Sequence, residues 1–311
     1  MRKKIYYWAS NTRKNSGEGI LALKFLKLLK LKYKDYLLVS LNKFNQNDSF
    51  IYNYIIPFVG VLKLWIYRLN NKKICYVNYL PIWNFLLILL LPKKTILGPI
   101  TGTNTKKILF YLILKYFGIF ILKFRRKKIL FSHDQFKGYF KRNNNFFYNF
   151  LLFEFTLKKK LFKKKFDFVI YLRKNRNKGN DFLIRVILEI SKKSKVAIIG
   201  DKFLILKKRT NIHNFVNLRR EKSLEIIAQS RNAIASKENV LSFFTLDCLS
   251  RGLKIFYNKN LKLDKSIKTN LLVSIQFNNL DRSLKIINNN YSNLIKKKYF
   301  KFKKKNFIDY L

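Results

Sequence analysis

Apolar and polar positions alternate along the chain with two different periods, which separate strands from helices. Near the N-terminus, the short apolar run Lys4–Ala9 predicts a strand, and Asp35–Ser40 predicts a second one. Between them, Ile20–Tyr33 places apolar residues at helical spacing with four lysines among them, so one broad face is apolar. This order predicts a βαβ unit, in which the segment between strand and helix can offer backbone N–H groups to a ligand.

The second half of the chain repeats this alternation more regularly. Four strands are predicted there, over Asp167–Tyr171, Lys195–Ile199, Asn232–Ser236 and Leu253–Tyr257. Helices are predicted between and after them, over Asn180–Lys192, Glu221–Ser230, Leu241–Arg251 and Leu280–Lys298. Strands that alternate with helices are typical of a parallel sheet with right-handed crossovers. The sequence therefore predicts the α/β class.

The length of the chain suits two domains of this kind. Its 311 residues correspond to two domains of about 150 residues each. The lysine-rich stretch at residues 158–165 predicts the boundary between them. We expect an N-terminal α/β domain over residues 1–160 and a C-terminal one over residues 161–311.

Two apolar segments of the first half have to be weighed as membrane spans. Residues 74–92 carry no charge, but two asparagines and a proline interrupt them. This segment predicts a strand over Ile74–Asn78, a turn at Tyr79–Pro81 and a helix from Ile82. Ile108–Leu122 is apolar except for one lysine, and it is shorter than the roughly 20 residues of a spanning helix. Short apolar segments with basic flanks favour a position at a membrane surface.

The N-terminal segment and the two cysteines indicate a cytoplasmic protein. The N-terminus begins with basic residues, but its apolar core covers only residues 5–9, which is too short for a secretory signal peptide. Cys75 and Cys248 form no disulfide framework and cannot build a zinc site by themselves. We therefore expect a cytoplasmic protein that is peripheral at the inner face of the membrane.

The charge of the chain is strongly one-sided. There are 66 basic and 16 acidic residues, which gives a net charge of +50. A codon bias toward A and T would also enrich lysine, so the total alone identifies no partner. Between Ser49 and His133, however, there is no Asp or Glu among 14 Lys and Arg. Such a field attracts lipid headgroups, nucleotide phosphates or nucleic acid, and we expect an anionic membrane surface as one partner.

One stretch of the second half has the residues to bind an anion. In YLRKNRNKGNDFLI, Arg173 follows a predicted strand, and Lys178 with Gly179 precedes a predicted helix. Two cations and a helix N-terminus at the mouth of a sheet stabilise the negative charge of a bound anion such as a phosphate group. A basic loop in a chain that is basic throughout would have the same residues.

A second stretch carries two acids around a helix. In ASKENVLSFFTLDCLSRGLKIFYN, Glu238 precedes the predicted helix, Asp247 lies within it, and Gly252 ends it before a strand. An ordinary helix with a C-terminal glycine cap would show the same pattern.

Together these stretches resemble the group 1 nucleotide-sugar-dependent glycosyltransferases, whose GT-B fold has two Rossmann-like domains facing a cleft. The resemblance implies that Arg173 and Lys178 are catalytic cations on the donor diphosphate, at the helix that follows Gly179. It implies that Asp247 binds the ribose of the donor and that Glu238 contacts the sugar. The family also implies that the final helix can return to the first domain.

The resemblance is weaker in the first domain and incomplete in the second. Gly17, Glu18 and Gly19 resemble the glycine loop of the first domain, which implies an acceptor or phosphate loop. His133 follows the predicted strand Lys128–Phe131, where catalytic or acceptor-contacting histidines lie in many such enzymes. In the second domain, Glu238 lies one residue before the family's position for the first acid, and the turn that follows has no glycine.

We therefore expect a glycosyltransferase that moves a sugar from a nucleotide-sugar donor to a saccharide or polyprenyl-linked acceptor in cell-surface polysaccharide synthesis. The chain has no Asp-x-Asp pair, which favours a metal-independent enzyme without a cofactor. Walker and dinucleotide fingerprints are also absent, which argues against ATPases and dehydrogenases. No motif predicts specific nucleic-acid binding. Two alternatives stay open, a non-catalytic GT-B relative and a basic polyanion-binding protein.

Overall fold

The computed structural model of the chain divides into two compact units after Glu154, and each is described by itself. The described residues are 5–9, 12, 17–32, 36–39, 55–82, 84–101, 109–125, 128–132, 136–140, 146–147, 162–174, 179–206, 209–237, 240, 242–261 and 270–291. The predicted final helix Leu280–Lys298 is shorter in the structure, where it covers Leu280–Asn290 and packs in the core of the second unit. Residues after 291 lie outside the described set, so a return of the last part of the chain to the first domain remains a prediction.

The first unit is built on a parallel sheet of six strands in the order β2-β1-β3-β4-β5-β6. The strands are β1 (Ile5–Trp8), β2 (Tyr36–Val39), β3 (Lys73–Pro81), β4 (Ile96–Thr101), β5 (Ile129–Phe131) and β6 (Phe146–Phe147). The helices are α1 (Gly17–Lys32), α2 (Ile56–Leu69), α3 (Phe85–Leu90) and α4 (Leu109–Arg125), with a 3-10 turn at Lys137–Tyr139.

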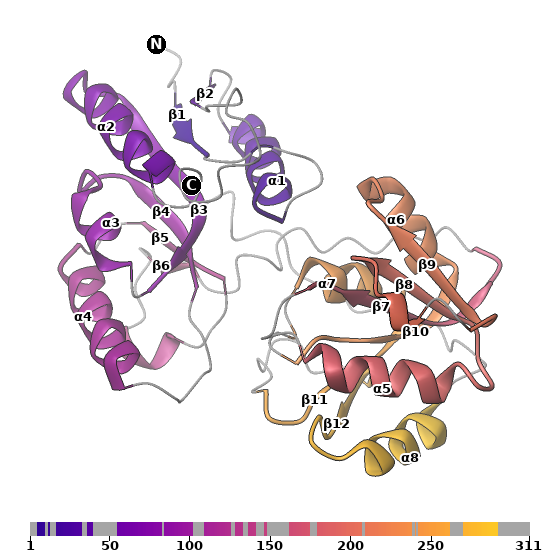
Figure 1. Cartoon of the computed structure of the whole chain (residues 1–311). Helices are drawn as coiled ribbons and strands as arrows, with labels where there is room; N and C mark the ends of the chain where they lie inside the picture. Colours follow the sequence, from indigo (N-terminus) through magenta and orange to yellow (C-terminus); the bar gives the residue numbers. More distant parts are fainter. Residues whose placement is uncertain are drawn as a thin grey trace. The chain divides into compact units, whose positions relative to one another are not determined.

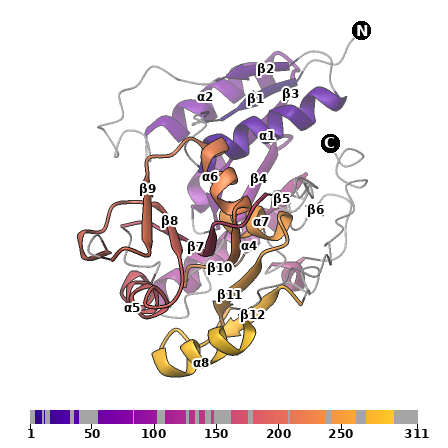
Figure 2. The same cartoon turned by 90° about the vertical axis from the view of Figure 1, so that its right-hand side faces the viewer.

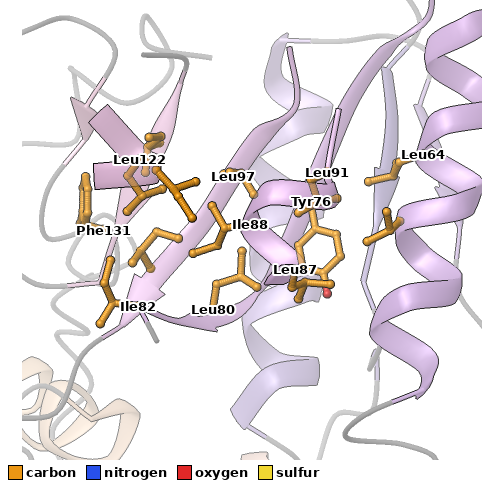
Figure 3. Close-up of a cluster of buried hydrophobic side chains, with 14 of the residues drawn as sticks. Leu64, Tyr76, Leu80, Ile82, Leu87, Ile88, Leu91, Leu97, Leu122 and Phe131 are labelled. Carbon is orange, nitrogen blue, oxygen red and sulfur yellow. The ribbon is translucent and has the colours of Figure 1, made fainter. Parts of the chain in front are cut away.

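The strand order determines which face of this sheet each helix covers. The connection from β1 to β2 runs in one direction, and the connections to β3, β4 and β5 run in the other. Because such crossovers are right-handed, α1 lies on one face and α2, α3 and α4 lie together on the other, as Figures 1 and 2 show. The inner sides of α2, α3 and α4 pack on the sheet through the buried cluster drawn in Figure 3, which includes Leu64, Leu87 and Leu122.

The second unit has a second parallel sheet of six strands, in the order β12-β11-β10-β7-β8-β9. Its strands are β7 (Phe166–Leu172), β8 (Val196–Gly200), β9 (Ile212–Val216), β10 (Ser230–Ile234), β11 (Lys254–Asn258) and β12 (Leu272–Ile275). Its helices are α5 (Asn180–Ile190), α6 (Arg220–Ala228), α7 (Phe243–Ser250) and α8 (Leu280–Asn290), with a 3-10 turn at Leu204–Leu206. Figure 1 shows α5 and α8 on one face of this sheet and α6 and α7 on the other.

The predicted α/β class is confirmed, and two details of the first unit differ from prediction. The strand β3 continues through the predicted turn at Tyr79–Pro81, with a shift of register between Val77 and Leu80, and the next helix begins only at Phe85. The helix α1 begins at Gly17, whereas a loop was expected to reach Gly19. An acid near a helix start is favoured by the helix dipole, which is consistent with a helix that includes Glu18 in its first turn.

The two segments weighed as membrane spans form other elements in the structure. Residues 74–92 contain most of β3 and the short helix α3, and most of Ile108–Leu122 belongs to α4. Within the part of the chain that the structure describes, no helix combines the length and apolar character needed to cross a bilayer. The longest of these apolar helices, α4, has 17 residues.

Candidate functional site

The second sheet has a point where the direction of its connections reverses. Counted from β7 along the chain, the strand order is 3-2-1-4-5-6, so β8 and β10 lie on opposite sides of β7. In open parallel sheets, ligands bind at the carboxyl ends of the strands beside such a reversal. The segments that follow β7 and β10 therefore flank the candidate site, and they contain Arg173, Gly179 and Lys237.

Gly179 starts helix α5 in a conformation that only glycine adopts readily. Its φ is 71° and its ψ is 38°, in the left-handed region. A Cβ atom at this position would lie 2.8 Å from Cβ of Lys237, so the space for a side chain is also occupied. The glycine thus permits the segments after β7 and β10 to approach each other closely.

Two hydrogen bonds hold the start of α5 and the loop after β7 in place. Asn180 Nδ2 donates to the carbonyl of Arg173 at 2.6 Å, which ties the loop after β7 to the helix. The N–H of Lys174 donates to Asp201 Oδ2 at 2.7 Å, which ties the same loop to the end of β8. A helix N-terminus carries partial positive charge, so this helix start favours an anion, and Asp181 in the first turn adds an acid beside it.

Two cationic side chains accompany this helix start. Arg173 and Lys237 are both exposed. Lys237 is further positioned through its carbonyl, which accepts from Asn258 Nδ2 at 3.1 Å. Exposed cations beside a helix N-terminus create a local field that favours a phosphate group.

The predicted ribose ligand Asp247 lies on α7 and is engaged by an arginine. Arg220 Nη2, at the first residue of α6, donates to Asp247 Oδ1 at 2.7 Å, and the two side chains are only 20% and 14% exposed. The guanidinium of Arg220 also lies 5.8 Å from the ring of Phe243. The carboxylate is therefore fixed in orientation, and a hydroxyl ligand would have to share it with Arg220.

Aromatic rings lie at the same edge of the sheet. Tyr171, at the end of β7, is stacked on Phe244, at the start of α7, with ring centroids 5.9 Å apart. Because Tyr171 is partly exposed, this pair offers an apolar surface beside Arg173 that a flat ring could contact.

The structure describes only some of the other predicted site residues. Gly17, Glu18 and Gly19 form the first turn of α1, the helix that follows β1, so they are helical and not a loop. A Cβ added at Gly17 would meet nothing within 4 Å, so this position has open space around it. Lys178, Glu238 and His133 lie outside the described residues, and their roles remain predictions.

Among the described residues, few side chains could bind a metal ion or act as a nucleophilic thiol. These residues contain no cluster of three His, Cys, Asp or Glu side chains that could hold a metal ion. Cys75 and Cys248 are free and buried. Burial raises the pKa of both thiols well above the ordinary value, so both are neutral at physiological pH and neither is a nucleophile.

Three residues of this site were missed by the sequence reasoning. Lys237, Arg220 and Asp201 each gain their position from a neighbouring strand or helix far away in sequence. Lys237 stands next to the predicted acid Glu238, but only the pairing of β10 with β7 brings it to Gly179. A predicted strand order would have been the signal that identified it.

We expect Gly179→Ala to destabilise the protein by about 2 kcal/mol, because alanine is strained at this φ and its Cβ would press on Lys237. Urea unfolding followed by far-ultraviolet circular dichroism measures the loss. The matched control is Gly138→Ala, since a Cβ there meets nothing within 4 Å. Equal stability of the two variants would show that the left-handed conformation of Gly179 is not required.

Comparisons with known proteins were made by sequence and by structure. No protein-family model matches the chain, and no curated protein sequence matches it either. Solved structures do match over nearly the whole chain. UDP-GlcNAc 2-epimerase from Methanocaldococcus jannaschii, in complex with UDP-GlcNAc and UDP, has a TM-score of 0.60 at 10% identity and is covered over 98% of both chains.

Two further structures are similar in the same way. Sucrose-phosphate synthase from Thermosynechococcus elongatus has a TM-score of 0.60 at 9% identity, covering 99% of this chain and 94% of its own. A glycosyltransferase from Rickettsia africae has a TM-score of 0.54 at 14% identity, covering 93% and 88%. Identities this low establish the fold alone. The chain has the GT-B fold of two Rossmann-like domains that these glycosyltransferases and the epimerase share.

Proposed function

We propose that the protein is a glycosyltransferase that uses a nucleotide-diphosphate-sugar donor. The observation that carries this proposal is the start of α5 at Gly179, which is accompanied by Arg173 and Lys237 and lies beside the strand reversal of the second sheet. A diphosphate is the ligand group that matches several N–H donors together with exposed cations. The GT-B fold of solved nucleotide-sugar enzymes supports the same assignment.

The reaction breaks one bond and forms another. The bond between the anomeric carbon of the sugar and the diphosphate oxygen breaks, and the diphosphate keeps the electron pair. An acceptor hydroxyl oxygen forms the new glycosidic bond and loses its proton to a base. Arg173 and the predicted Lys178 stabilise the charge that grows on the departing diphosphate, where preorganised cations act most strongly. Asp247 and Glu238 hold the ribose and the sugar of the donor.

The first domain supplies the acceptor side in this proposal. Gly17, at the exposed start of α1, has open space around it and follows the first strand of its sheet. His133 is the proposed base or acceptor-contacting residue. The acceptor is a saccharide or a polyprenyl-linked saccharide of cell-surface polysaccharide synthesis at the inner face of the membrane. The enzyme works without a metal ion or cofactor.

Product analysis tests this proposal against its rivals. Purified protein is incubated with a panel of nucleotide sugars, with and without membrane extracts that contain lipid-linked saccharides. A transferase releases the nucleoside diphosphate and labels an acceptor. An epimerase converts the nucleotide sugar without any acceptor, which would contradict the proposal. A non-catalytic relative or a general polyanion-binding protein would leave all nucleotide sugars unchanged.

We expect Asp247→Asn to raise the Kd for the nucleotide about tenfold and to change the transfer rate at saturation little, because the ribose contact is equal in the ground and transition states. Calorimetric titration with the nucleotide measures the Kd. The control is Glu225→Gln, which removes the acid of an exposed ion pair with Lys222 away from the site. An unchanged Kd in Asp247→Asn would remove Asp247 from the ribose site.

A further inference from the structure

The outer face of the helix layer α2, α3 and α4 is apolar, although it is exposed. Its exposed side chains include Leu62, Ile66, Leu69, Leu89, Phe120 and Phe124. Leu69 is 75% exposed and Phe124 is 81% exposed. The outer face of a helix in a soluble domain is ordinarily polar, so an apolar face of this extent indicates an interaction surface.

These side chains are additional to the core and not part of it. On α4, Ile119 and Leu122 are buried in the cluster against the sheet, in which Figure 3 labels Leu122. Ile113, Phe117, Phe120 and Phe124 follow one another at helical spacing on the exposed side. The helix therefore carries two apolar faces, of which the sheet needs only one.

The three helices form one continuous surface. Trp65 Nε1 on α2 donates to the carbonyl of Leu90 on α3 at 2.7 Å. The rings of Phe85 on α3 and Phe117 on α4 meet edge to face, with centroids 5.0 Å apart. Figure 1 shows the helices on the same face of the sheet. The exposed apolar side chains consequently belong to a single patch, which we call the α2–α4 face.

Cations border the α2–α4 face on one side. Lys72 follows α2, Lys93 and Lys94 follow α3, and Lys123 lies in the last turn of α4, and all four are exposed. The three helices run in the same direction between parallel strands, so these lysines collect at one edge of the layer. No acid occurs from Ser49 to His133. Lysines beside an apolar face can extend to lipid phosphates while their stems stay on apolar surface.

The charge also argues against a second copy of the chain as the occupant. A symmetric dimer through this face would bring two basic borders together without any acid from this region to pair with them. A bilayer with anionic headgroups has the opposite charge and an apolar interior. Because α4 has 17 residues and packs on the sheet with one side, it can lie in the plane of the interface but not cross it.

We propose that the α2–α4 face inserts into the headgroup region of an anionic bilayer, with Phe120 and Phe124 among the inserted side chains and the lysine edge on the lipid phosphates. This inference deepens the proposed function and rests on it, because it takes the membrane as the location of the enzyme and names the surface that contacts the lipids. Vesicle binding is measured without any sugar transfer, so either proposal can fail while the other stands.

Flotation with vesicles tests the apolar contribution. We expect the protein to bind vesicles of phosphatidylcholine with phosphatidylglycerol at low salt and to keep part of this binding at high salt. Phe124→Ser should lower the partition coefficient about tenfold at both salt concentrations, because it removes an inserted ring. The matched control is Ile205→Ser, a side chain 61% exposed in the second unit, which should bind like the wild type.

Charge reversal tests the lysine edge. Lys123→Glu should lower partition about tenfold on anionic vesicles and little on pure phosphatidylcholine. Lys193→Glu, an exposed lysine of the second unit, is the control for total charge. Binding that is abolished by salt and equal in wild type and Phe124→Ser would overturn insertion. A dimer in lipid-free solution that Phe124→Ser dissociates, without vesicle binding, would overturn the membrane as occupant.

Quenching of Trp65 fluorescence measures how deeply the α2–α4 face inserts into the bilayer. This side chain lies on the α2–α4 face and is 42% exposed. Brominated phosphatidylcholine quenches indoles that reach the acyl chains, so we expect quenching in the wild type that is reduced in Trp65→Phe. Vesicle binding without any difference in quenching between the two proteins would contradict insertion.

Discussion

Arg173→Ala is expected to lower the rate of sugar transfer at least about tenfold, and Lys178→Ala is expected to do the same. Both cations act on charge that develops on the diphosphate as it leaves, so their loss removes roughly 2–4 kcal/mol of transition-state stabilisation. Arg173 is suited to this role because its carbonyl is tied to Asn180 and it directly precedes the loop to α5. Steady-state transfer rates at saturating donor measure the effect.

The same loop supplies the controls for this prediction. Lys174 is exposed and its backbone N–H bonds to Asp201, so Lys174→Ala removes a charge without disturbing that hydrogen bond. Arg176→Ala is the second control, since it matches no position of the family motif. If all four variants lost activity equally, the loop would be a basic surface without a dedicated diphosphate site.

Arg125→Met should destabilise the first unit by about 3 kcal/mol, because three carbonyl groups would lose a buried charged donor. Of these, the Pro92 carbonyl would keep the N–H and the hydroxyl of Thr95 as donors. Arg125 is 7% exposed, and its guanidinium donates to the carbonyls of Ile88, Leu91 and Pro92, the last two at 2.7 and 2.6 Å. Burial lowers the pKa of Arg125 to about 10, so the group is still charged at neutral pH. It thereby joins α4 to the end of α3.

Tryptophan fluorescence measures this prediction selectively. All three tryptophans of the chain precede residue 84, so their emission follows the unfolding of the first unit. Lys123→Met, an exposed change two residues away on the same helix, is the control and should alter stability little. An Arg125→Met protein as stable as the control would show that α4 docks through its apolar contacts alone.

The central strands could be predicted from the sequence because each is a short apolar run between polar segments. The edge strands β9 and β12 could not, since β9 contains His213 and Asn214 among its five residues and neither strand is apolar throughout. The helix α2 was missed for the opposite reason. Its sequence IPFVGVLKLWIYRL is apolar on nearly every side, so it shows no amphipathic period.

The candidate site was predicted only as far as local sequence allows. Gly179 was identified because a glycine between a strand and a helix has a local signature. Lys237 and Arg220 reach the site through strand order and helix packing, and these depend on residues about 60 and 27 positions away in the chain. The apolar α2–α4 face was expected only as a membrane-surface segment, because sequence alone does not tell which of two apolar faces a sheet will cover.

Equilibrium binding of nucleotides tests the central claim most directly. Thermal-shift and calorimetric titrations compare UDP, GDP and CMP with heparin, a polyanion that has no nucleoside. We expect one nucleoside diphosphate to stabilise the protein at a single site, more than its monophosphate does, and Arg173→Ala and Asp247→Asn each to weaken this binding. Equal stabilisation by heparin and by every nucleotide, unchanged in both variants, would contradict a nucleotide-sugar site.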